Sequence, residues 1–149
     1  MKRLSSLAAI AAIALTGIAP VAGAQASWPI IYSQNGVKVA LDTAGAKRNS
    51  DGSYITRTRW DYSSPRRLES KRPYTQMTEV ALVRCTPVRI KRLTESFYAE
   101  NGAVVKEGSM PDPSHVQYMS WDRPKLRSDG ARAFANVCST LAKRTRARR

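Results

Sequence analysis

Histidine, cysteine and acidic residues are scarce in this sequence. Its 149 residues include one His and two Cys, and 25 Lys and Arg stand against 11 Asp and Glu. Most zinc, haem and iron–sulfur sites need three or four His or Cys ligands, so we expect no metal and no cofactor. A lone histidine also leaves little room for His-based catalysis. These counts point away from an enzyme, and the length suits one domain.

The first residues have the pattern of a secretory signal peptide. A basic start at residues 1–3 precedes an apolar run at 7–18, and small residues follow at 22–24. We expect cleavage after Ala24, with Ala26 as the alternative. A membrane anchor is disfavoured because a span needs about 20 residues. No cysteine lies near the cleavage point to carry a lipid, so we expect a product secreted across the inner membrane, either periplasmic or extracellular at the cell surface.

The two cysteines, Cys85 and Cys138, would then lie in an oxidising compartment. An even count of cysteines there predicts a disulfide between them. In the chain-entropy model, closing so long a loop stabilises the fold by roughly 4 kcal/mol. The alternative is a pair of free, buried thiols.

Most of the chain after the signal peptide has strand-like patterning. The predicted strands are residues 28–32, 36–41, 53–62, 76–86, 88–100, 103–106 and, as a last candidate, 115–121. Turn sequences at 33–36, 49–52 and 101–102 separate several of them. The apolar phase of the fifth strand slips, which predicts a bulge near Lys91 and Arg92. Residues 63–73 are polar and basic, and we expect an exposed loop there.

One helix is predicted, at the C-terminus. Ser128 can cap its start, and Phe134, Val137, Cys138 and Leu141 fall at i, i+3, i+4 and i+7. Cys138 therefore belongs to the apolar stripe, so the disulfide would clamp the helix to the strand that Cys85 ends. The expected fold is α+β, mainly an antiparallel sheet with this helix laid on it.

Short segments in a fixed order resemble the surface-adhesin protein E family of small secreted proteobacterial proteins. They are Trp28, residues 38–42, 46–48 and 54–62, Cys85, Arg89-Ile90, Phe97-Tyr98, residues 102–105, Trp121, Pro124 and Cys138. The resemblance implies a sheet of about six strands with a disulfide-tethered C-terminal helix. It delimits a domain at 25–142, between the signal peptide at 1–24 and a basic tail at 143–149. It also implies a non-enzymatic protein that binds host extracellular-matrix or serum proteins.

The basic excess is the main chemical signal. The candidate polyanion- or partner-binding residues are Arg57, Arg59, Arg66, Arg67, Lys71, Arg72, Lys91 and Arg92. Such a surface would suit sulfated glycosaminoglycan or lipopolysaccharide phosphates. The equally open alternative is a solvated surface that keeps the protein soluble. Tyr54, Trp60 and Tyr62 share one strand face and are expected in the core, so we do not expect sequence-specific nucleic-acid binding.

Catalytic alternatives find little support. His115 is expected to be an exposed histidine in a loop, beside Pro113 and Ser114. Glycoside hydrolysis needs two carboxylates at a defined separation, and nothing in the spacing selects Glu95 with Glu100 or Asp61 with Glu79. We therefore assign no catalytic residue.

The leading hypothesis is a secreted, non-enzymatic binding module. The alternative is a structural periplasmic protein attached to anionic envelope lipids. An inhibitor of lysozyme is disfavoured because two strongly basic proteins repel each other. A homodimer through an open sheet edge stays a possibility.

Overall fold

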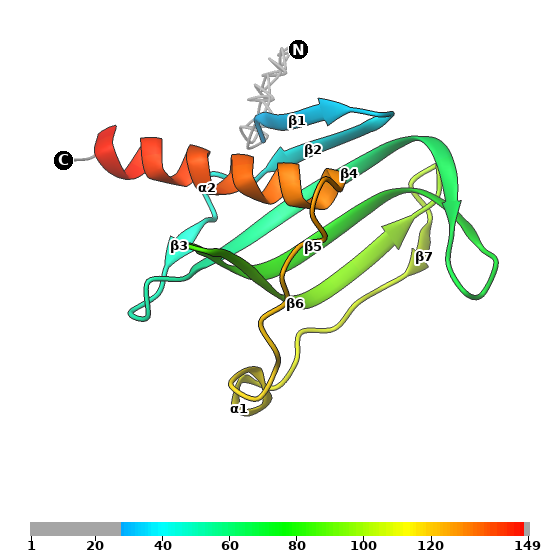
Figure 1. Ribbon diagram of the computed structural model, residues 1–149. Coiled ribbons are helices and arrows are strands. Elements are labelled where there is room, and N and C mark those ends of the chain that lie inside the picture. The colour runs from blue at the N-terminus through cyan, green and yellow to red at the C-terminus, as the bar shows by residue number, and fades with distance from the viewer. Residues whose placement is uncertain (1–27, 148–149) are drawn as a thin grey trace, which may run out of the picture.

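The computed structural model describes residues 28–147 as one curled antiparallel sheet and a long C-terminal helix (Figure 1). Its elements are β1 (Ile30–Gln34), β2 (Val37–Leu41), β3 (Lys47–Arg48), β4 (Tyr54–Arg67), β5 (Pro73–Cys85), β6 (Val88–Tyr98), β7 (Val104–Lys106), α1 (Pro113–Val116) and α2 (Asp129–Ala147). The predicted signal peptide lies outside the described residues. None of the described helices is long and apolar enough to cross a membrane.

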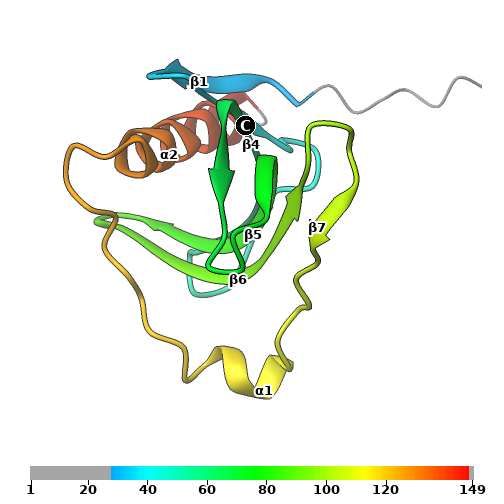
Figure 2. The same cartoon turned by 90° about the vertical axis from the view of Figure 1, so that its right-hand side faces the viewer.

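The strands run in the order β1-β2-β4-β5-β6-β7, and the two-residue β3 pairs separately with β4. All pairings are antiparallel, as expected. The sheet curls around α2, which lies on its concave side, while α1 lies on the opposite side (Figure 2). We call the sheet face toward α2 the inner face and the other the outer face.

The β1–β2 turn confirms the hairpin predicted at residues 33–36. Asn35 and Gly36 have φ angles of 52° and 70°, the left-handed conformation that two-residue hairpin turns require and that Asn-Gly favours. A Cβ on Gly36 would also collide with the Ser63 hydroxyl. The Ser63 N–H donates to the Gly36 carbonyl at 2.8 Å, so this turn rests directly on β4.

The bulge predicted near Lys91 and Arg92 is confirmed in β6, one residue later. Ala81 pairs with Arg92 but Val80 pairs with Thr94, so Leu93 is the extra residue of β6. An extra residue reverses the alternation of faces beyond it. As a result, Phe97 rather than Ser96 faces inward and is buried.

The core lies between the inner face and α2. Phe134 on α2 is buried, with its ring 6.2 Å from that of Trp60 on β4. The predicted disulfide joins Cys85 to Cys138, with 5.5 Å between the Cα atoms, and so clamps α2 to the end of β5. Ser128 caps the helix as predicted, because its Oγ accepts the Ala131 N–H at 3.1 Å.

One expectation in the C-terminal half of the chain is wrong. Residues 115–121 do not form a strand: Asp112 caps the short helix α1, with Pro113 at its start. The chain that follows α1 pairs with the sheet at an isolated bridge between Ile90 and Asp122. Proline suits the first helical position, where its missing N–H has no partner to lose. The helix α2 runs on to Ala147, into the residues predicted to be a basic tail.

Candidate functional site

The segment expected to be a loop, residues 63–73, instead forms the end of a two-stranded hairpin. β2 pairs with β4 only as far as Tyr62, and β6 pairs with β5 only as far as Gln76. Beyond these positions β4 and β5 pair only with each other, at Arg66 with Tyr74 and Arg67 with Pro73. We call residues 63–73 the arm; Figure 1 shows it extending past the neighbouring strands, at the end of the sheet away from the C-terminus.

The arm carries four of the eight candidate basic residues, all of them exposed: Arg66, Arg67, Lys71 and Arg72. Its single acidic residue is Glu69. The turn is held by two backbone hydrogen bonds, from the Leu68 N–H to the Arg72 carbonyl and from the Lys71 N–H to the Leu68 carbonyl. The Arg67 guanidinium also donates to the Lys71 carbonyl, at 3.0 Å. The arm is therefore a cationic projection with an ordered tip.

An aromatic cluster supports the base of the arm. The Tyr74 ring meets Tyr62 and Phe97 edge to face, at centroid distances of 5.7 and 4.9 Å. The Arg66 guanidinium lies 4.4 Å from the Tyr62 ring centroid, an attractive cation–π arrangement. Burial raises the pKa of Tyr62 above its usual range, so this ring is a neutral phenol at physiological pH.

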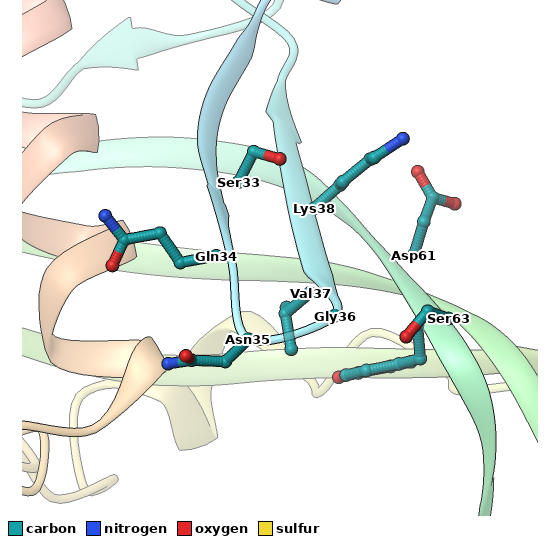
Figure 3. Close-up of a pocket in the computed structure, with 9 residues that line it drawn as sticks. Ser33, Gln34, Asn35, Gly36, Val37, Lys38, Asp61 and Ser63 are labelled. Atoms are coloured by element: carbon teal, nitrogen blue, oxygen red, sulfur yellow. The ribbon is translucent and has the colours of Figure 1, made fainter.

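Two open pockets, each of about 300 Å³, flank the base of the arm and share Asp61, Tyr62 and Ser63. The first lies against the β1–β2 turn, where Lys38 and Asp61 project on the same side (Figure 3). Asp61 accepts hydrogen bonds from Arg59 at 3.1 Å and from Gln76 at 2.8 Å. The lining of the first pocket includes Asp61 and the hydroxyls of Ser33 and Ser63, and it contains no histidine or cysteine.

The other four candidate basic residues do not join the arm. Arg57 and Arg59 lie on the outer face of β4, where Arg59 is paired with Asp61. Lys91 and Arg92 point to opposite faces of β6. The structure thus divides the predicted basic surface into separate groups instead of one patch.

Lys91 is buried, with 6% of the residue exposed, so it does not contribute to an exposed basic surface. Its Nζ donates to the Val116 carbonyl at 2.9 Å and lies 5.1 Å from the Trp121 ring centroid. Through these contacts the Lys91 ammonium group holds the chain that follows α1 against the outer face.

Arg92 belongs to a cluster of charges on the inner face that the sequence did not indicate. Its Nε lies 3.0 Å from a carboxylate oxygen of Glu79 and 3.7 Å from one of Glu95. Glu79 and Glu95 are direct cross-strand partners. Burial raises the pKa of Glu79 to about 7, and the Arg92 charge opposes that rise.

The two carboxylate pairs considered from the sequence, Asp61 with Glu79 and Glu95 with Glu100, do not come together as this cluster does. Glu79 faces inward and Asp61 outward, so these two do not share a face. Glu100 follows the end of β6 and is exposed. His115 lies in α1 and is exposed, as expected.

The described chain is thus a curled antiparallel sheet that a disulfide clamps to α2 and from which a cationic arm projects. The family model for surface-adhesin protein E matches residues 28–139, and the chain belongs to this family. No curated protein and no solved structure matches it. The family is one of surface or secreted proteins, and membership supports a surface adhesin-like, non-enzymatic role.

Proposed function

We propose that this protein is a secreted binding module whose arm contacts acidic or sulfated groups on host extracellular-matrix or serum proteins. The observation that carries the proposal is the exposure of Arg66, Arg67, Lys71 and Arg72 on one hairpin that projects from the sheet. Membership of the surface-adhesin protein E family supports the same role.

The arm suits this role for a physical reason. Ordering flexible side chains and loops at an interface costs affinity. Here the tip is fixed by the Arg67–Lys71 hydrogen bond and the base by the aromatic rings of Tyr62 and Tyr74. A projecting group of like charges also attracts an oppositely charged partner before contact, which raises the association rate.

The test compares two triple variants that remove equal charge. R67Q/K71Q/R72Q neutralises the arm, and K143Q/R144Q/R146Q neutralises the end of α2. Binding of the oxidised mature protein to heparin and to vitronectin would be measured at about 50 and 200 mM salt, a range over which multi-contact electrostatic binding weakens strongly. We expect the arm variant to lose at least about tenfold in affinity and the α2 variant to keep most of it.

Vitronectin binding that persists at the higher salt and needs the arm would support an adhesin-like module. Heparin binding that both variants weaken equally would contradict the arm as the contact surface, because it would then depend on net charge alone.

A second candidate role is attachment to the anionic lipids of the cell envelope. It is favoured by Lys143, Arg144 and Arg146, which gather near the C-terminal end of α2, away from the arm (Figure 1). Fractionation separates the two roles, because a protein found at the surface or in the medium fits adhesion and a strictly periplasmic one fits the envelope role. Vesicles containing anionic lipid should then retain the arm variant and release the α2 variant.

A further inference from the structure

Three arginines lie in a row across the outer face, at the end of the sheet that the disulfide fixes. Cys85 faces inward to its disulfide, so the preceding Arg84 faces outward. Its direct partner on β6 is Arg89. The chain before α2 continues the row: Ile90 and Asp122 exchange backbone hydrogen bonds of 3.0 and 2.8 Å in an antiparallel bridge.

That bridge determines the position of Arg123. In an antiparallel pair, the residue after one partner lies opposite the residue before the other. Arg123 therefore comes next to Arg89, on the strand edge of β6. We call Arg84, Arg89 and Arg123 the arginine row; none of them was among the basic residues singled out from the sequence.

The row has more positive charge than its surroundings neutralise. Arg84 pairs with Asp51 at 3.0 Å, and hydrogen bonds from Ser53 lower the pKa of Asp51 to about 2 and keep it ionised. Among residues 28–147, neither Arg89 nor Arg123 forms an ion pair. The Nη1 atom of Arg89 is buried and has no hydrogen-bond partner among the same residues.

Such an arrangement is unfavourable without a further partner. Like charges directly opposite each other on a sheet repel, and a buried donor left unpaired costs roughly 1–3 kcal/mol. An unpaired buried group in a native fold is one sign of an ion or water at that place.

The row is also held in place. The Arg84 guanidinium lies 4.2 Å from the centroid of the Trp121 ring, which Lys91 also contacts. Lys91 also donates to the Val116 carbonyl. The segment that brings Arg123 to β6 is therefore anchored before Trp121 by this hydrogen bond and after Trp121 by the Ile90–Asp122 bridge. Figure 2 shows this segment on the side of the sheet opposite α2.

We propose that the arginine row is an oxyanion-binding site that takes a sulfate or phosphate ester group. Guanidinium groups match the oxygen geometry of these groups and bind them through paired, charge-assisted hydrogen bonds. An oxyanion there supplies acceptors to Arg89 and Arg123 and separates the opposed charges of Arg84 and Arg89. The site lies on the outer face, apart from the arm, and does not depend on the function proposed for the arm.

The first experiment titrates the oxidised mature protein with inorganic sulfate and with inorganic phosphate at constant ionic strength, with heat of binding and Tm as readouts. R123Q changes an exposed residue and is the main variant, and R89Q is the second. R57Q is the matched control, because it removes one exposed arginine from the same face outside the row. We expect R123Q and R89Q to weaken oxyanion binding at least about tenfold and R57Q to leave it unchanged.

A second pair of titrations identifies the source of the ester group. A sulfated disaccharide represents a glycan and glycerol 3-phosphate represents a phosphate headgroup, and tighter, row-dependent binding of either one supports the site and names its source. The proposal is overturned if sulfate and phosphate do no more than chloride at equal ionic strength, or if R57Q weakens binding as much as R123Q. The R67Q/K71Q/R72Q variant should bind these small anions normally, so failure of the arm and failure of the row are distinguishable.

Discussion

The Glu79 carboxylate lies on the inner face with 1% of the residue exposed, 3.0 Å from the Nε of Arg92. The contact is one of charge, because the carboxylate oxygen nearest Arg92 has no hydrogen-bond partner. The Arg92 side chain remains 44% exposed, so water screens its charge and it compensates only part of the cost of burying Glu79.

This pair predicts that stability falls as the pH rises through neutrality. The pKa of Glu79 is about 7 in the folded protein and 4.5 as its ordinary value, so between these values the folded state holds a proton that the unfolded chain releases. The free energy of unfolding should drop by about 2 kcal/mol between pH 5 and pH 8. Urea denaturation at a series of pH values measures the drop.

The control for this prediction is E79Q, which keeps the shape of the side chain and removes its titration. Its stability should vary less with pH over the same interval and should exceed that of the unmodified protein at pH 8. An unchanged pH slope in E79Q would show that another group causes the dependence.

Loss of the Cys85–Cys138 bond should destabilise the protein strongly, because the bond closes a separation of 53 residues and holds α2 to β5. C85S/C138S is expected to lower the free energy of unfolding by roughly 4 kcal/mol. Urea denaturation with and without dithiothreitol measures this, and the reductant should leave the double variant unaffected. A cost well under 1 kcal/mol would mean that packing alone holds the helix.

Phe134 should carry much of the contact between α2 and the sheet. It is buried against Trp60, so F134A should cost about 3–5 kcal/mol in unfolding free energy, in line with large-to-small substitutions in protein cores. L126A is the comparison, since Leu126 is 81% exposed and its replacement should cost less than about 0.5 kcal/mol. Similar losses in the two variants would contradict the placement of the core.

Lys91 should act as a structural anchor. K91M keeps the apolar stem of the side chain but removes the hydrogen bond to Val116 and the contact with Trp121. We expect faster hydrogen exchange at the Ile90 and Asp122 amides, which form the bridge beside it. K106M, at an exposed position, should leave these amides as protected as before; equal protection in both variants would exclude the anchoring role.

Local chemistry explains what was predictable in the fold. The Asn35-Gly36 turn and the Ser128 cap each depend on residues adjacent in sequence, and the bulge after Arg92 appears as a slip in the apolar phase of one strand. The pairing of Cys85 with Cys138 follows from there being only two cysteines.

The sequence does not predict the strands of the arm, and the reason is physical. Pro65, Pro73 and the surrounding charges disfavour a strand inside a sheet, where every N–H is needed and one face is buried. Beyond Tyr62 and Gln76, however, β4 and β5 have no other strand beside them. Proline and charge are tolerated there, so residues expected in a loop form a hairpin instead.

The candidate site residues were likewise predictable only where a local pattern places them. Alternation along β4 correctly places Arg57 and Arg59 on one face. The predicted basic surface also included Lys91 and Arg92, two adjacent residues of β6 near the expected bulge. Lys91 is buried by a segment that returns from 25 residues further along the chain. Glu79 meets Glu95 because Leu93 shifts the register of β6 by one residue.

The α+β class, the helix at the C-terminus, the disulfide and the excess of basic charge were predictable, because each depends on composition or on periodicity within one segment. Which charges act together was not predictable and follows from the folded arrangement. It placed Arg67 and Lys71 on a projecting arm, buried Lys91, and paired Arg84 with Arg89 across β5 and β6. These arrangements depend on strand register and on distant segments packing together, and sequence periodicity carries no information about either.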